Sequence, residues 1–295
     1  MNYKILQGNN IDILKTMEAN SMDACITDPP YGMGMEHWDG SVPTVDTWQE
    51  VIRVLKPGAF CLSFCSPELY HRMATAVEAS GFKIVDMIQW MVTTKMAKHN
   101  RLKPAHEPIV VAQKPFDGSL KQNMDKWGVG QINVDMARVP WDGKPPTGWV
   151  AQGHKRRTFG KPGNTKGSKE VDGTEDANPT GRYPSNIIGQ FDEPEHQKYF
   201  YAPRTTRKEK GEYNDHPTVK PINLMRYLVR IYSPKEGTVL DPFNGTGTTG
   251  IGSVQEGRKY IGIELEKHYV EVSEKRIKDH CEKPNNTIEK LFDYE

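Results

Sequence analysis

Along residues 1–115, the spacing of apolar side chains alternates between the period of a helix and the period of a strand. Apolar residues that recur three and four positions apart indicate helices, and short apolar runs that end at turn residues indicate buried strands. The tripeptide Lys56-Pro57-Gly58 is typical of a turn between a helix and the next strand. This pattern predicts helices at residues 11–17, 48–55 and 68–80, and strands at residues 22–27, 59–65, 83–91 and 107–113.

The alternation stops in the middle of the chain and returns near its end. Residues 116–207 are dense in Gly, Pro, Lys, Asn and Asp, and residues 161–169 have no period and indicate a loop or linker. Strands that alternate with helices favour an α/β fold with a mainly parallel sheet, here built from both ends of the chain. After Pro221 the pattern predicts helices at residues 222–232, 248–256 and 267–281, and strands at residues 238–240 and 259–264.

Composition limits the class of protein. A chain of 295 residues can form one α/β domain with an insertion, and a mean hydropathy of −0.69 indicates a soluble protein. No apolar stretch approaches the roughly 20 residues that span a bilayer, and the amino terminus lacks a signal-peptide pattern. We therefore expect a cytoplasmic protein without a membrane partner. Cys25, Cys61, Cys65 and Cys281 lack metal-ligand spacing, so we expect inert thiols and no metal site.

Charge is distributed unevenly behind a formal net charge of +1. Residues 95–170 contain fifteen Lys or Arg against six Asp or Glu, so the rest of the chain is net negative by eight. A basic middle between acidic ends is typical of a protein that binds a polyanion, and a solvated basic loop is the alternative. We predict phosphate contacts from the densest run, which contains Lys155, Arg156 and Arg157.

The tetrapeptide Asp28-Pro29-Pro30-Tyr31 follows the strand expected at residues 22–27. Two consecutive prolines have a fixed φ and donate no backbone hydrogen bonds, so they suit a rigid loop at the carboxyl end of a strand. Open α/β sheets bind their ligands at that end. The loop combines a carboxylate, carbonyl acceptors and an aromatic face, which together can hold a flat group that carries an exocyclic amine.

A glycine-rich loop follows the strand expected at residues 238–240. Residues 245–250 satisfy the spacing GxGxxG, and Glu264 lies at the end of the next strand. This pattern is also typical of dinucleotide-binding proteins, so a nicotinamide oxidoreductase is an alternative. Asp241 weighs against that alternative, because a carboxylate beside the glycines repels a pyrophosphate and suits a ligand with ammonium and sulfonium groups. Glu264 can bind a ribose diol in either case.

Together these two loops resemble those of the β class of DNA amino-methyltransferases, which use S-adenosylmethionine. The order of the loops along the chain is that of the β class, and the resemblance covers nearly the whole chain apart from the middle region. Further stretches are similar to motifs of the family: Lys103-Pro104-Ala105-His106-Glu107-Pro108, Gly181-Arg182-Tyr183-Pro184-Ser185-Asn186, His216-Pro217-Thr218-Val219-Lys220-Pro221 and Asp241-Pro242-Phe243-Asn244-Gly245-Thr246-Gly247-Thr248-Thr249.

The resemblance implies a Rossmann-like methyltransferase fold with a mainly parallel, seven-stranded sheet. It divides the chain into a catalytic half at residues 1–115, an inserted basic target-recognition region at residues 116–207 and a cofactor-binding half at residues 208–295. The catalytic residues that it implies are Asp28, Pro29, Pro30 and Tyr31. The residues that it implies for S-adenosylmethionine are Gly8, Asn9, Asp28, His216, Thr218, Lys220, Asp241, Phe243, Asn244, Gly245, Gly247, Thr248, Thr249 and Glu264.

Asn9 departs from the pattern of the family, which usually has Gly-Asp at this place. The family's aspartate accepts a hydrogen bond from the adenine of the cofactor. Asn9 keeps an amide oxygen as an acceptor but lacks the charge. We therefore predict a retained contact and a weaker affinity for the cofactor.

The resemblance also implies the reaction, which is methylation of a flipped base in double-stranded DNA, as in restriction-modification systems. Tyr31 would stack on the flipped base, and Asp28 and the carbonyl of Pro29 would accept the two hydrogens of its exocyclic amine. An aspartate at position 28 favours N6 of adenine, with N4 of cytosine as the alternative. RNA or a protein glutamine as the methyl acceptor is also compatible with such a loop, and so is a DNA-binding module without catalysis. The resemblance leaves a homodimer open.

Overall fold

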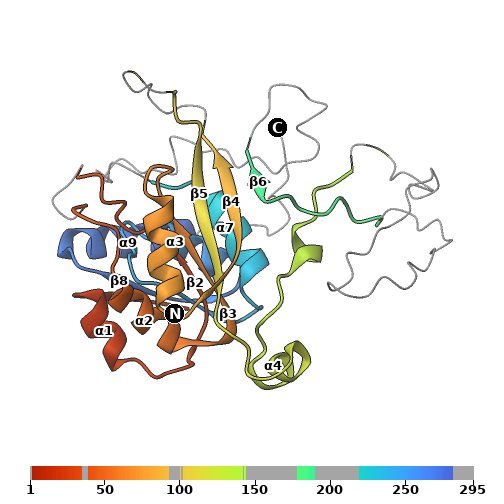
Figure 1. Cartoon of the computed structure of the whole chain (residues 1–295), viewed down its shortest axis with the longest axis horizontal. Coiled ribbons are helices and arrows are strands. Elements are labelled where there is room, and N and C mark those ends of the chain that lie inside the picture. Colours follow the sequence, from red (N-terminus) through yellow and green to blue (C-terminus); the bar gives the residue numbers. More distant parts are fainter. Residues whose placement is uncertain are drawn as a thin grey trace.

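The computed structural model describes residues 2–34, 39–92, 102–141, 178–189 and 219–281, together with Asn100 and Gly143. Its centre is a β-sheet (Figure 1). The sheet has eight strands in the order β1-β8-β7-β2-β3-β5-β4-β6. The strands are β1 (Tyr3–Gln7), β2 (Met22–Thr27), β3 (Leu55–Phe64), β4 (Lys83–Met91), β5 (His106–Gln113), β6 (Ile187–Ile188), β7 (Thr238–Asp241) and β8 (Lys259–Glu264).

The sheet is mainly parallel, as the alternating pattern predicted. The first five strands in this order, β1, β8, β7, β2 and β3, are parallel to one another. Strand β5 runs antiparallel to its neighbours β3 and β4. The count of seven strands was too low. The residue pattern indicated neither β1 nor β6. Strand β6 contains two residues that pair with Gln89 and Trp90 of β4, and so short a segment has no period by which a sequence can reveal it.

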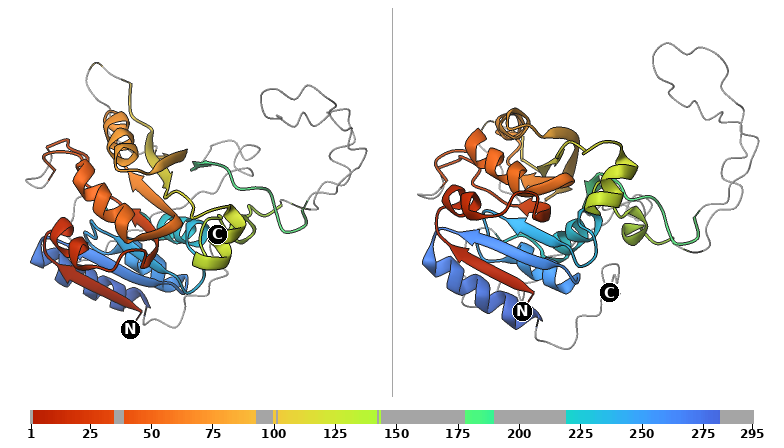
Figure 2. Two further views of the ribbon diagram at one scale, coloured as in Figure 1. Left: turned by 60° about the horizontal axis from the view of Figure 1, so that its bottom comes forward. Right: turned by 90° about the horizontal axis from the view of Figure 1, so that it is seen from below.

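Helices cover both faces of the sheet, as the views in Figure 2 show. One apolar cluster lies between the sheet and the first group of helices, α1 to α3, and a second lies between the sheet and the last group, α7 to α9. Neighbouring strand residues such as Cys25 and Ile26 point to opposite clusters, because side chains alternate along a strand. The helices are α1 (Asn10–Thr16), α2 (Val45–Val54), α3 (Tyr70–Ala79), α4 (Leu120–Trp127), α7 (Ile222–Tyr232), α8 (Thr248–Gln255) and α9 (Lys267–Cys281).

The turn expected at Lys56-Pro57-Gly58 is instead an irregular stretch inside β3. Met22 pairs with Leu55 and Ala24 pairs with Phe60, so β3 carries several extra residues opposite β2. Gly58 has a φ of +81°, and Pro57 accepts a hydrogen bond at 2.9 Å from the side chain of Asn123, which is buried in α4. The proline and glycine therefore interrupt the ladder without ending the strand.

The described part of the middle region packs against the α/β core. Helix α4 lies on β3, and the 3-10 turn η1 (Val134–Ala137) lies on α7. Neither element was expected. Ser119 caps α4 through a capping box, and Gly128 ends the helix with a φ of +71°. Within the described ranges, no helix combines the length and the apolar composition that crossing a membrane requires.

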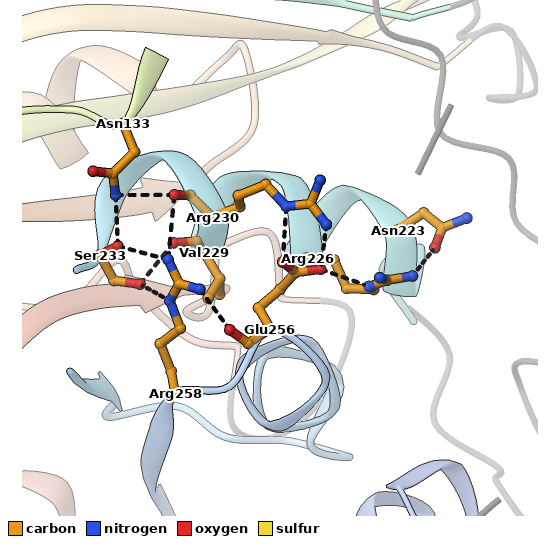
Figure 3. Close-up of polar contacts among 8 residues, drawn as sticks. All are labelled: Asn133, Asn223, Arg226, Val229, Arg230, Ser233, Glu256 and Arg258. Carbon is orange, nitrogen blue, oxygen red and sulfur yellow. Dashed lines mark hydrogen bonds and ion pairs between the residues drawn. The ribbon is translucent and has the colours of Figure 1, made fainter. Parts of the chain in front are cut away.

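Helices α7 and α8 are joined by buried charged side chains, shown in Figure 3. The carboxylate of Glu256, at the end of α8, accepts hydrogen bonds from Arg226 at 2.9 Å and from Arg230 at 2.8 Å and 3.0 Å. Arg258 instead donates to the carbonyl of Ser233 at 3.0 Å, and Asn133 donates to the same carbonyl at 2.8 Å. Arg258 and Asn133 thus satisfy carbonyl groups that the end of a helix leaves without partners.

Candidate active site

The predicted site residues gather at one edge of the sheet. In the order β1-β8-β7-β2, four neighbouring parallel strands end at Gln7, Glu264, Asp241 and Thr27. The loops that follow these strands open into one cavity of about 340 Å³. The predicted residues that line it are Gly8, Asn9, Asp28, Pro29, Pro30, Tyr31, Lys220, Asp241, Phe243, Asn244, Gly245, Thr248, Thr249 and Glu264.

Asp28 and Tyr31 belong to a cluster of four polar side chains on one side of this cavity. The hydroxyl of Tyr31 lies 2.7 Å from Oδ1 of Asp28 and 3.2 Å from Oε2 of Glu107. The ammonium of Lys220, immediately before α7, donates to Oδ2 of Asp28 at 2.5 Å and lies 3.5 Å from Oε2 of Glu107. The cluster therefore contains two carboxylates, one ammonium and one phenol hydroxyl.

Burial and charge shift the pKa values in this cluster. Burial alone would lower the pKa of Lys220, but the carboxylates of Asp28 and Glu107 outweigh burial and raise it. Burial raises the pKa of Tyr31, and the same two carboxylates raise it further. Lys220 is therefore a cation and Tyr31 a neutral donor at ordinary pH.

The loop after Tyr31 is held by Asp39. Oδ1 of Asp39 accepts a hydrogen bond from the backbone of Gly32 at 2.7 Å, and Oδ2 accepts one from Met33 at 3.1 Å. Asp39 is 5% exposed and lines the cavity. This clamp fixes the chain directly beyond the Asp-Pro-Pro-Tyr loop.

The glycine-rich loop presents backbone and carboxylate groups to the other side of the cavity. Oε2 of Glu264 accepts a hydrogen bond from the backbone of Gly245 at 2.7 Å, and Oε1 accepts one from Glu266 at 2.9 Å. Gly247 has a φ of +77° and precedes α8. It does not line the cavity, because its Cα faces α9, where an added Cβ would lie 2.9 Å from Cβ of Ser273. The absence of a Cβ at Gly247 allows α8 to pack closely on α9.

Asp241 is a buried carboxylate at the end of β7. It accepts hydrogen bonds from the hydroxyl of Thr27 at 2.6 Å and from the backbone of Phe243 at 3.1 Å. Burial raises its pKa to about 6. Among the described residues it has no cationic partner within ion-pair distance.

Asn9 lines the cavity and also begins α1. Its side-chain oxygen accepts hydrogen bonds from the backbone of Ile11 at 2.9 Å and of Asp12 at 3.4 Å. The oxygen expected to face the cofactor therefore also caps the helix. Of the other predicted site residues, His216, Thr218, Lys155, Arg156 and Arg157 lie outside the described residues.

Glu107 and Asp39 line the cavity, but the sequence patterns did not identify them as site residues. Glu107 lies within the stretch Lys103 to Pro108, which resembles a motif of the family. That resemblance is the sequence signal that could have identified Glu107 as a site residue. Asp39 lies in a loop, where no period indicates which way a side chain points. Cys65 lies near the same cluster, and burial raises the pKa of its thiol to about 12, as expected of an inert thiol.

Comparison with known proteins identifies the class. Residues 22–275 match the sequence profile of a family described as DNA methylase, of the N6 and N4 type. This chain belongs to that family. The type II methyltransferase M.HindIII of Haemophilus influenzae is 24% identical over 94% of this chain and 96% of its own length.

Two solved structures have the same fold. The complex of M1.HpyAVI with S-adenosylmethionine has a TM-score of 0.53 and 22% identity, and the match covers 93% of this chain and 99% of that one. The cytosine-N4-specific PvuII DNA methyltransferase has a TM-score of 0.60 and 15% identity, covering 95% of this chain and 92% of its own.

The protein is therefore an enzyme that transfers a methyl group from S-adenosylmethionine to an exocyclic amine of a DNA base. Membership of this family removes the alternative of a nicotinamide oxidoreductase. The residues at the cavity fit the cofactor chemically. Asp241 offers a buried negative charge to an ammonium group, and Glu264 offers carboxylate oxygens that can also accept from a ribose diol.

Proposed function

We propose that the methyl acceptor is N6 of adenine and that Asp28 holds this amine. The observation that carries the proposal is the carboxylate of Asp28 at the carboxyl end of β2, in the same cavity as the glycine-rich loop. An aspartate at this position of the loop favours adenine in the family that the sequence resembles. A carboxylate also accepts hydrogen bonds from an amine more strongly than a neutral hydroxyl does.

In this proposal the adenine leaves the duplex and stacks on Tyr31. Asp28 and the carbonyl of Pro29 accept the two N6 hydrogens, which directs the nitrogen lone pair toward the methyl group. The bond between nitrogen and methyl carbon forms as the bond from carbon to sulfur breaks, and sulfur keeps the electron pair. Asp28 stabilises the positive charge on nitrogen and accepts the released proton, directly or through water.

The bound S-adenosylmethionine supplies an electrophilic methyl group on a sulfonium. In the proposed assignment, Asp241 binds the ammonium of the cofactor and Glu264 binds its ribose. Asn9 contacts the adenine ring of the cofactor with those atoms of its side-chain amide that do not cap α1. Lys220 lines the end of the cavity nearest Asp28.

Residues 116–207 are proposed as the region that recognises the DNA sequence. The positive excess of residues 95–170, which include much of this region, supports the proposal. Two pairs of an arginine and an aromatic ring between residues 138–141 and residues 182–183 also support it. Arg138 lies 5.7 Å from the ring centre of Tyr183, and Arg182 lies 4.4 Å from that of Trp141. Tyr183 is 66% exposed. Arginines and aromatic rings at a surface suit phosphates and bases.

The test is to methylate unmodified genomic DNA with isotopically labelled S-adenosylmethionine and to identify the labelled nucleoside by mass spectrometry. We expect N6-methyladenine. Asp28→Asn should lower kcat by about 10²- to 10⁴-fold, the range for loss of a general base, and should leave cofactor binding measurable. Asp46→Asn, in the exposed first turn of α2, is the control and should retain kcat. Labelled N4-methylcytosine would refute the choice of adenine.

A further inference from the structure

The side chains around Asp28 raise a question of charge. Both oxygens of Asp28 have partners within the protein, since Tyr31 contacts Oδ1 and Lys220 contacts Oδ2. An amine that becomes positive on Asp28 has to compete with the ammonium of Lys220. Paired with Asp28 alone, that ammonium would cancel the charge on which the proposed mechanism depends.

Glu107 supplies a second carboxylate to the same two donors. Its Oε2 lies 3.2 Å from the hydroxyl of Tyr31 and 3.5 Å from the ammonium of Lys220. The side chain of Glu107 is 12% exposed and that of Lys220 is 8% exposed, so water screens this pair poorly. The carboxylates of Asp28 and Glu107 and the ammonium of Lys220 together carry a net charge of −1.

The surroundings of Lys220 favour a short movement between the two carboxylates. Its ammonium lies 5.1 Å from the ring centre of Phe64 and 5.5 Å from that of Tyr31, and aromatic faces hold a cation without fixing its direction. The ionisable groups that face it from the packed elements are Asp28 after β2, Tyr31, Cys65 after β3 and Glu107 on β5. Of these, only the two carboxylates are anions, and the hydroxyl of Tyr31 also accepts a hydrogen bond from the ammonium at 3.2 Å.

We propose that Glu107 is a positioning residue that takes Lys220 and the hydroxyl of Tyr31 when the amine of the base occupies Asp28. The proposal rests on the proposed role of Asp28. With Glu107 present, Lys220 has a second anion, so Asp28 keeps its negative charge for the amine. Without Glu107, Lys220 stays on Asp28, and the carboxylate is a weaker acceptor and a weaker base.

The experiment measures kcat and KM for S-adenosylmethionine in Glu107→Gln. We expect kcat to fall about 10- to 100-fold, which is part of the loss that follows removal of a preorganised charge, while KM changes little. Loss of packing alone would disturb the cavity as a whole and would change KM together with kcat.

Two further variants separate this role from loss of packing. Glu107→Asp retains the charge, so its kcat should recover most of the loss. Asp23→Asn is the matched control. It removes a buried carboxylate that pairs with Lys56 at 2.6 Å, in the first part of β2 and away from the cavity. It should lower thermal stability and leave kcat unchanged.

The proposal is overturned if Glu107→Gln keeps the wild-type kcat, if KM changes as much as kcat does, or if Glu107→Asp fails to recover kcat. Should Glu107→Gln not fold, a kcat of Glu107→Asp as low as that of Asp28→Asn would overturn it as well. Failure of the proposed function looks different. If the wild type yields N4-methylcytosine, the choice of adenine is wrong, but the test of Glu107 still applies, because Asp28 would hold either amine in the same way.

Discussion

Asp241 is a carboxylate whose burial disfavours its own charge. Burial raises its pKa to about 6, whereas an aspartate in an unfolded chain titrates near 3.9. The folded protein therefore holds this proton more tightly, and ionised Asp241 costs stability as the pH rises from about 4 to about 6. An ammonium group bound beside it would offset that cost.

We therefore predict that cofactor binding depends on pH through Asp241. Above pH 6 the carboxylate is charged and binding should be strongest, and below pH 6 the Kd should rise by up to about tenfold per pH unit as Asp241 gains a proton. Asp241→Asn should bind weakly at pH 8 and lose this dependence, while Asp46→Asn should retain it. Titration calorimetry with S-adenosylmethionine between pH 5 and pH 8 measures the effect. An unchanged pH dependence in Asp241→Asn would exclude this ammonium contact.

At the scale of residues, the sequence predicted the site residues whose amino-acid type and neighbours along the chain are enough to suggest a role. Asp28 and Tyr31 were found because two prolines make their loop rigid whatever surrounds it. Glu107 was not found as a site residue, because the role that we propose for it depends on Lys220, which is far away along the chain and close only in the fold. Asn9 was found, but its second task as the cap of α1 is visible only in the structure.

At the scale of elements, α7 and α8 depend on the single carboxylate of Glu256, whose side chain is 1% exposed. We predict that Glu256→Gln destabilises the protein by about 3–5 kcal/mol, because it leaves Arg226 and Arg230 buried without their anion. Thermal or urea unfolding measures the loss.

The control for this prediction is Glu271→Gln on α9. Glu271 lies 3.8 Å from Lys267, and the two side chains are 66% and 75% exposed. A solvated pair of this kind contributes about 0.3–0.5 kcal/mol. Equal losses in the two variants would contradict the importance that we give to the buried cluster.

Most periodic elements were predicted well, whereas the regular strand β1 and the irregular elements were not. The strands at 22–27, 83–91 and 259–264 and the helices at 222–232 and 267–281 have the expected bounds. Each contains a full repeat of its pattern, which depends on the local sequence alone. The long start of β3 was missed, since only the side chain of Asn123 shows that Pro57 and Gly58 form a bulge rather than a turn.

At the scale of the whole molecule, the net charge does not indicate DNA binding, whereas the distribution of charge along the chain does. The prediction that Lys155, Arg156 and Arg157 contact DNA phosphates concerns residues outside the described ranges, and it can be tested directly. Changing all three to glutamine should reduce the slope of log K against log salt by up to about 2.7, since each phosphate contact contributes about 0.9. Fluorescence anisotropy with a labelled duplex measures this slope.

A matched control changes three exposed lysines elsewhere, Lys4 on β1 and Lys275 and Lys278 on α9. Both triple variants lose the same charge, so a general effect of net charge would lower both slopes equally. A slope that falls only in the variant of residues 155–157 would assign the phosphate contacts to that segment. An unchanged slope in that variant would exclude them.

The sequence by itself determined the parallel α/β class and the two loops that we propose to hold an amine and a methyl donor. These features follow from short-range causes, namely the period of apolar side chains, the fixed φ of proline and the freedom of glycine. The tertiary structure decided the order of the eight strands, which brings the two loops to one cavity, and the meeting of Asp28, Tyr31, Glu107 and Lys220. Such meetings depend on packing between distant segments, whose free energy belongs to the whole fold and leaves no pattern in the local sequence.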